Sequence, residues 1–97
     1  MSLRQPHVLI GLSTFRRNPL LDRCLASLAT QQPCPGWTAS VLVVDNDHQG
    51  SARGMVDAWQ ARFSLPLSYE IEPERGISMA RHRAIAHALE TGADYIA

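Results

Sequence analysis

Cysteine, long apolar runs and targeting signals are scarce in this chain, and each absence excludes a class of protein. The two cysteines, Cys24 and Cys34, have neither the spacing of a metal-binding knuckle nor that of a redox motif, so we expect reduced thiols. No apolar stretch approaches the ~18 residues of a membrane span. No secretory signal is recognisable either. The sequence therefore predicts a cytoplasmic protein with no membrane segment in this chain.

The chain also lacks lysine and any excess of charge. Nine basic residues balance nine acidic ones, so no net field attracts nucleic acid, and we predict no nucleic-acid partner. All nine basic residues are arginines, whose planar guanidinium groups suit bidentate contact with phosphate or carboxylate. A content of 45% hydrophobic and 19% charged residues in 97 residues is typical of one small globular domain. We predict a single domain over residues 1–97.

Apolar runs and helical periods alternate along the chain. Short runs bounded by turn-forming residues predict strands at 7–12, 41–44 and 67–71. Helical periods predict a helix that Asn18 caps at its start, a second helix after residue 51, and a third over residues 76–90 that ends at Gly92. The first two strands lack inward and outward alternation, which indicates cover on both faces. This order predicts an α/β fold, a Rossmann-like three-layer sandwich with a mainly parallel sheet.

A fourth apolar run begins at residue 94, and the sequence stops within it. We therefore expect the domain to be incomplete at its C-terminus and the chain to be a fragment of a longer protein. Glycine-rich phosphate loops are missing after the first strand, which disfavours a dinucleotide-binding Rossmann domain and a P-loop enzyme.

Polar clusters follow the first three strands, at residues 13–17, 45–47 and 72–76. In open α/β sheets, ligands bind beyond the carboxyl ends of the strands, so these clusters predict a binding site. Phe15 directly follows the first strand, where its ring can stack on a base or pack within its own loop. Asp45 and Asp47 could hold a metal ion, contact a nucleobase or cap a loop.

The third helix carries an arginine on its expected inward face. The stripe of residues 77, 80, 84, 85 and 88 includes the position of Arg81, so its guanidinium needs an anion nearby. That anion could be Asp45 or a ligand phosphate at the start of the helix. His82, Arg83 and His87 are expected to point outward into solvent.

Three segments together resemble a known family. VLIGLSTFRRNPLLDRCLASLATQ, VLVVDNDHQG and EPERGISMARHRAIAHALETGADYIA resemble, in order and spacing, the N-terminal half of family-two glycosyltransferases with the GT-A fold. The resemblance covers the chain from residue 7 onward. It implies the nucleotide-sugar-binding part of a GT-A-like domain, from a parent enzyme that transfers a sugar from a donor such as a UDP-sugar to an unknown acceptor.

The resemblance also implies roles for particular residues. It implies that the base and ribose are held by Ser13, Thr14 and Phe15, and that Asp45 accepts a hydrogen bond from the base. Arg75 and Arg81 would approach the base or the diphosphate, for which arginine forks are suited. Asp47 is expected to cap or line the same pocket.

The same resemblance implies Mg²⁺ or Mn²⁺ in the parent protein. The metal-binding Asp-x-Asp of the family would follow Ala97, so we expect no metal and no catalytic residue in this chain. Without a cation to neutralise the departing diphosphate, we predict that the fragment alone is inactive.

Two alternatives remain open. A haloacid-dehalogenase-like, Mg²⁺-dependent phosphohydrolase would use Asp45 as nucleophile and Asp47 as acid/base. A non-catalytic module would instead self-associate into a homo-oligomer through exposed sheet surface.

Overall fold

The computed structural model describes residues 5–97, and strands and helices alternate along them. They are β1 (His7–Thr14), α1 (Asn18–Leu28), β2 (Thr38–Asp45), α2 (Arg53–Gln60), β3 (Leu67–Ile71), α3 (Ile77–Thr91) and β4 (Tyr95–Ile96). The order predicted from the sequence is confirmed. The first two strands are longer than predicted because their polar ends continue the ladder.

The four strands form one sheet in the order β3-β2-β1-β4, and every pair is parallel. β1 and β2 pair along their whole length, from His7 opposite Thr38 to Thr14 opposite Asp45. β4 pairs only with Val8 and Leu9. The backbone contact on that side ends at Gly11, whose N–H donates to the carbonyl oxygen of Ala97 at 2.9 Å. Among residues 5–97, the end of β1 therefore has a strand neighbour on one side only.

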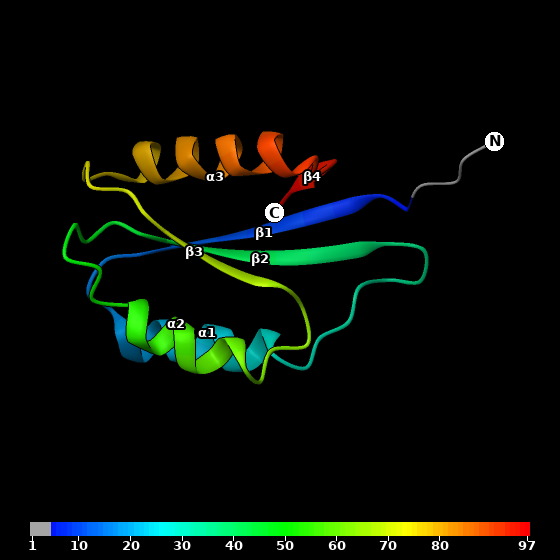
Figure 1. Cartoon of the computed structure of the whole chain (residues 1–97), viewed down its shortest axis with the longest axis horizontal. Helices are drawn as coiled ribbons and strands as arrows, with labels where there is room; N and C mark the ends of the chain where they lie inside the picture. Colours follow the sequence, from blue (N-terminus) through cyan, green and yellow to red (C-terminus); the bar gives the residue numbers. More distant parts are fainter. Residues whose placement is uncertain (1–4) are drawn as a thin grey trace.

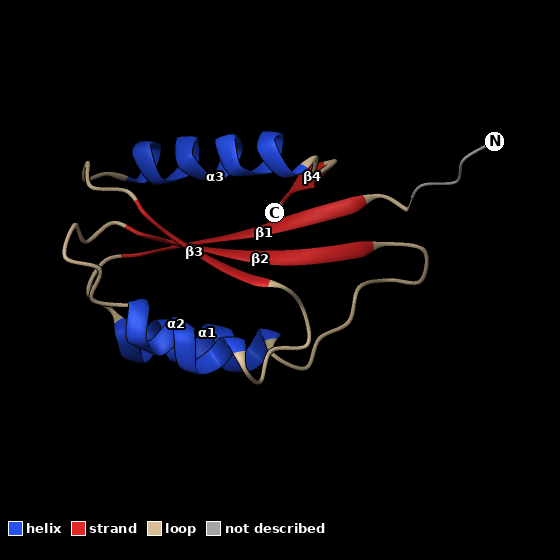
Figure 2. Cartoon of the chain, in the orientation of Figure 1, coloured by secondary structure: helices blue, strands red, loops and turns tan. Residues whose placement is uncertain are grey.

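Helices cover both faces of the sheet, with α1 and α2 on one face and α3 on the other (Figures 1 and 2). Val41 and Val43 of β2 belong to the core under α1 and α2, and Leu42 and Val44 belong to the core under α3. All four are at most 1% exposed. Cover on both faces explains why β2 shows no alternation, and the three-layer, Rossmann-like α/β fold is confirmed.

α3 packs on the sheet through a row of alanines. Ala80, Ala84 and Ala88 are buried, and a Cβ built on Gly11 would be in van der Waals contact with Cβ of Ala84, at 3.6 Å, so small side chains face each other where the helix crosses β1. The predicted inward stripe is wrong for its two isoleucines and for Arg81, which is exposed. Ile77 is 68% exposed and Ile85 46% exposed, because the small alanine row one position away faces the sheet instead.

The helix ends were predicted with mixed success. Gly92 ends α3 in the left-handed conformation at φ 76°, as expected. Asn18 was expected to cap α1, but it is already the first helical residue, and Arg17 stands at the cap position without a side-chain capping bond. The Asn18 amide instead donates to the carbonyl oxygen of Ser51 at 3.1 Å, which ties α1 to the loop after β2.

Two further properties concern membranes and thiols. No helix in the part of the chain that the structure describes is long and apolar enough to cross a membrane. Cys24 and Cys34 are both free, Cys24 half-buried and Cys34 exposed.

Candidate functional site

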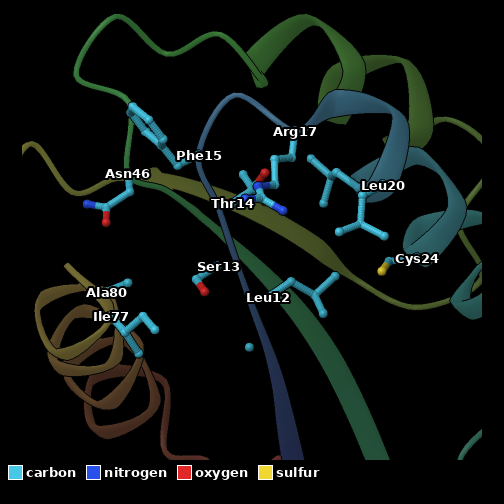
Figure 3. Close-up of a pocket in the computed structure, with 12 residues that line it drawn as sticks. Leu12, Ser13, Thr14, Phe15, Arg17, Leu20, Cys24, Asn46, Ile77 and Ala80 are labelled. Atoms are coloured by element: carbon cyan, nitrogen blue, oxygen red, sulfur yellow. The ribbon is translucent and has the colours of Figure 1, made fainter. Parts of the chain in front are cut away.

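A cavity of about 470 Å³ lies at the C-terminal end of β1. The side chains of α1 border it on one side and those of α3 on the other (Figure 3). It is lined by Gly11, Leu12, Ser13, Thr14, Phe15, Arg17, Leu20, Leu21, Cys24, Asn46, Ile77 and Ala80. Three predicted nucleotide-binding residues, Ser13, Thr14 and Phe15, are therefore brought together in one cavity.

A second cavity of about 590 Å³ continues along α3 toward β4. It shares Gly11, Leu12, Ser13, Ile77 and Ala80 with the first cavity, so we treat the two as one cleft. Arg81, a further predicted residue, lines this second part.

The charged side chains that line the cleft are arginines. Arg17 lines the first cavity and Arg81 the second, and neither lining includes an Asp or Glu side chain. Both arginines are exposed, and within residues 5–97 neither guanidinium has an ion-pair partner. The predicted contact between Arg81 and Asp45 is therefore wrong. An uncompensated pair of guanidinium groups favours an anionic ligand in the cleft.

Arg75 and Phe15 join two loops beside the first cavity. The guanidinium carbon of Arg75 lies 3.7 Å from the centroid of the Phe15 ring, and that of Arg16 lies 5.1 Å from it. Both are cation–π contacts. Phe15 thus packs against an arginine of its own loop and one of the next loop, and it also lines the cavity. Its stacking on a base stays a prediction.

Asp45 is turned away from the cleft and is fully buried, with 0% exposure. Its Oδ1 accepts the N–H of Asp47 at 3.0 Å, and its Oδ2 accepts the N–H of Ala52 at 2.9 Å and the hydroxyl of Tyr69 at 2.6 Å. Burial, together with this carboxylate, raises the pKa of the Tyr69 hydroxyl above its usual range. Of the three interpretations left open for Asp45, capping the loop and the start of α2 is the one that these contacts fit.

Asp47 is 1% exposed and also lies outside the cleft. Its Oδ2 accepts from Nε of Arg16 at 3.1 Å, and its Oδ1 accepts the N–H of Gln49 at 3.1 Å. The Ser51 side chain, the Gln49 N–H and Arg16 lower its pKa to about 2. Asp47 instead lines a smaller cavity of about 340 Å³ with Arg16, Asn18, Pro19, Gln49 and Ser51.

Asn46, between the two aspartates, is the cleft residue that the sequence analysis missed. It is 8% exposed and lines the first cavity. Its Nδ2 donates to the carbonyl oxygens of Glu72 at 2.8 Å and Glu74 at 2.7 Å, and its Oδ1 accepts the N–H of Gly76 at 2.9 Å. Strand parity was the signal available, since Leu42 and Val44 face α3 and the next residue in that series is Asn46.

Two residues expected to be solvated on α3 are paired instead. Arg83 donates to Oε1 of Glu72 at 3.0 Å and to Oε1 of Glu70 at 3.2 Å, and Nδ1 of His87 lies 2.6 Å from Oε2 of Glu70. The carboxylates of Glu72 and Glu70 raise the pKa of Arg83. The N–H of Glu74 and the Arg83 guanidinium lower the pKa of Glu72. The outward prediction is wrong because Glu70 of β3 and Glu72, the first residue after β3, both face α3.

A metal centre is not evident in the described part of the chain. Within residues 5–97, no group of three or more His, Cys, Asp or Glu side chains could hold a metal ion.

Comparison with known proteins gives one informative similarity. The chain is similar to the succinoglycan biosynthesis protein ExoM of Rhizobium meliloti (strain 1021), with 36% identity over 76 residues. The similarity covers 78% of this chain and 24% of the relative, so the chain spans about a quarter of that protein's length. No protein-family model matches the chain, and no solved structure matches it.

Proposed function

We propose that this chain is the nucleotide-binding part of a glycosyltransferase and that its cleft holds the nucleotide of a nucleotide-sugar such as a UDP-sugar. The similarity to a succinoglycan biosynthesis protein supports a glycosyltransferase, because a glycan is assembled by the transfer of sugars. The parent protein would transfer the sugar to an acceptor that this chain does not identify.

The observation that carries the proposal is the charge of the cleft. Arg17 and Arg81 line it without any Asp or Glu side chain, and Phe15 offers an aromatic ring beside them. A nucleoside diphosphate has both of the groups that this lining suits, an anionic diphosphate and a planar base. The cleft also lies at the carboxyl ends of parallel strands, where ligands of open α/β sheets bind.

In this proposal the base and ribose occupy the first cavity, beside Ser13, Thr14 and Phe15. Asn46 replaces Asp45 as the residue that contacts the base. Within residues 5–97 its Oδ1 accepts one hydrogen bond, from Gly76, and a carbonyl oxygen has two lone pairs, so it can accept a second bond from a base N–H. Asp45 does not contact the ligand in this proposal. It stabilises the loop that carries Asn46 by accepting the N–H of Asp47.

Arg75 and Arg81 are proposed to act on the phosphates or the base from the α3 side. Arg17 joins them at the α1 side of the first cavity. Mg²⁺ or Mn²⁺ is proposed for the parent protein, where it would neutralise the leaving diphosphate. Residues 5–97 show no cluster fit for such an ion, so no role for it is assigned to this chain's own side chains. The inactivity of the isolated chain stays a prediction.

A titration followed by backbone amide NMR tests the proposal. UDP, GDP and TDP are each added to the 97-residue chain with and without Mn²⁺, and uridine and inorganic phosphate serve as partial ligands. We expect shifts at Ser13, Phe15 and Asn46 with UDP, and weaker binding of uridine and of phosphate. No shift with any nucleotide at millimolar concentration would refute the proposal.

Single substitutions sharpen this test. Arg81→Gln is expected to weaken UDP by about tenfold or more, because a charge-assisted hydrogen bond is worth roughly 1.5–3 kcal/mol, and to leave uridine unaffected. Arg23→Gln is the matched control, since Arg23 is exposed on α1, lines neither cavity and has no ion-pair partner in the described part of the chain.

The phosphohydrolase alternative receives no support from this geometry. A nucleophilic Asp45 would need an open face toward substrate and cation, whereas both of its oxygens accept internal hydrogen bonds at 0% exposure. The self-associating module stays a prediction.

A further inference from the structure

We propose that Arg83 is a positioning residue, which sets the ligand affinity of the cleft by holding the β3–α3 loop (residues 72–76) in place through Glu72. This inference rests on the proposed nucleotide site for its ligand, and on the hydrogen bonds of the loop for its mechanism.

Asn46, which follows β2, connects the β3–α3 loop to the cleft. The Asn46 side chain makes three hydrogen bonds to the loop backbone, at Glu72, Glu74 and Gly76, and it is the residue of this network that lines the first cavity. Both the orientation of the Asn46 amide and the direction of its free lone pair therefore depend on where the loop lies.

The loop has one inward-turned carboxylate, that of Glu72, which is 7% exposed. Its Oε2 accepts the N–H of Glu74 at 3.0 Å, and its Oε1 accepts from Nε of Arg83 at 3.0 Å. Burial of a carboxylate without a cation is costly in free energy. The loop therefore keeps this conformation only while Arg83 neutralises the Glu72 carboxylate.

Arg83 is held on its other side by Glu70 of β3, at 3.2 Å from Nη1. It therefore connects α3, the sheet and the loop with charge-assisted hydrogen bonds. His87, one turn further along α3, contacts the other oxygen of Glu70. Neither Arg83 nor Glu72 lines a cavity of the cleft, so neither is expected to touch the ligand.

Hydrogen exchange of the ligand-free, full 97-residue chain tests the positioning step. In Arg83→Gln we expect the amides of Glu74 and Gly76 to exchange about tenfold faster, because loss of a charge-assisted bond of that strength changes a local opening equilibrium by this factor. The amides of β1 and β2 should change by much less. Equal acceleration throughout the chain, or none at Glu74 and Gly76, would overturn the inference.

Two further variants guard against a simple folding defect. Arg83→Lys keeps the charge and should restore slow exchange in part, since an ammonium group can pair with one carboxylate but cannot form the fork. Glu72→Gln removes the carboxylate and should accelerate the same two amides. Arg23→Gln removes an arginine elsewhere and should change neither amide.

UDP affinity is measured on the same variants at a temperature where all of them remain folded. Arg83→Gln should weaken UDP about fivefold to tenfold without contacting it, and Arg83→Lys should recover part of the loss. Unchanged affinity despite a loosened loop would overturn the inference. If the unaltered chain binds no nucleotide, the proposed function fails, and the exchange measurement alone decides whether Arg83 positions the loop.

Discussion

The hydroxyl of Tyr69 donates a 2.6 Å hydrogen bond to Oδ2 of Asp45, and this bond joins β3 to the buried end of β2. Removal of the hydroxyl in Tyr69→Phe leaves the ring in place but takes one donor from a buried carboxylate. We expect a loss of roughly 1.5–3 kcal/mol in the free energy of unfolding, the range for hydrogen bonds to charged groups. Urea denaturation at neutral pH measures this loss.

Tyr95→Phe is the matched control for that measurement. Tyr95 is 58% exposed and packs against Trp37, so loss of its hydroxyl should change stability very little. Equal effects of the two substitutions would contradict a special role for the bond between Tyr69 and Asp45.

Asp47 predicts a dependence of stability on acid pH. Its pKa is lowered from 3.8 to about 2 in the folded chain, so the folded state favours the ionised form. The resulting stability is fully present above pH 3.8 and is lost as the pH falls from there toward 2. We therefore expect Asp47→Asn to be less stable than the unaltered chain at pH 6, and the difference to shrink below pH 4.

Thermal unfolding of both proteins between pH 2 and pH 6 checks this prediction. Asp57→Asn is a suitable control, because Asp57 is exposed on α2 and has no ion-pair partner in residues 5–97. A difference between Asp47→Asn and the unaltered chain that stays constant with pH would show that charge is not the cause.

The order of strands and helices was predictable from the sequence. Which row of α3 side chains faces the sheet, the alanines or the isoleucines, was not. Periodicity shows that alanines and isoleucines lie on one side of the helix, and hydrophobicity alone favours burial of the isoleucines. Contact of α3 with the sheet at Gly11 selects the alanine row, and that contact depends on residues far apart in the sequence.

The site was predictable at the level of loops, and less so at the level of single side chains. The position of Ser13, Thr14 and Phe15 at the C-terminal end of β1 sufficed to place them in the cavity. Which of Asp45, Asn46 and Asp47 faces the cleft depends on strand parity and on the N–H donors that hold each carboxylate away from it. Arg83 pairs with Glu72, which lies 11 positions earlier in the sequence, and with Glu70, which lies 13 positions earlier. No local sequence pattern reveals these pairs.

Phe15 gives a prediction for the base. Base stacking on an aromatic ring is worth roughly 1–3 kcal/mol, so Phe15→Leu should weaken UDP about tenfold while inorganic phosphate binds as before. Titration calorimetry with both ligands measures the difference. Phe63→Leu, a ring that packs against Trp59 away from the cleft, is the control. If Phe15→Leu leaves UDP affinity unchanged, the base does not stack on this ring.

The exposed apolar side chains of α3 and β4 bear on the predicted homo-oligomer. Ile77, Ile85, Leu89, Tyr95 and Ile96 are 45% to 77% exposed and lie on consecutive elements. A cluster of such side chains favours contact with a second copy of the chain. We expect sedimentation velocity to show an increasing average mass as the concentration of the chain rises.

The double substitution of Ile85→Gln with Leu89→Gln should return the chain to a single monomeric species. Leu20→Gln serves as the matched control, because Leu20 on α1 is 47% exposed, close to the 46% of Ile85, and lines the α1 side of the first cavity rather than belonging to α3 or β4. It should leave the association unchanged, since its side chain is not part of the cluster. A chain that stays monomeric at every concentration, or an association that the double substitution does not reduce, would contradict self-association through this surface.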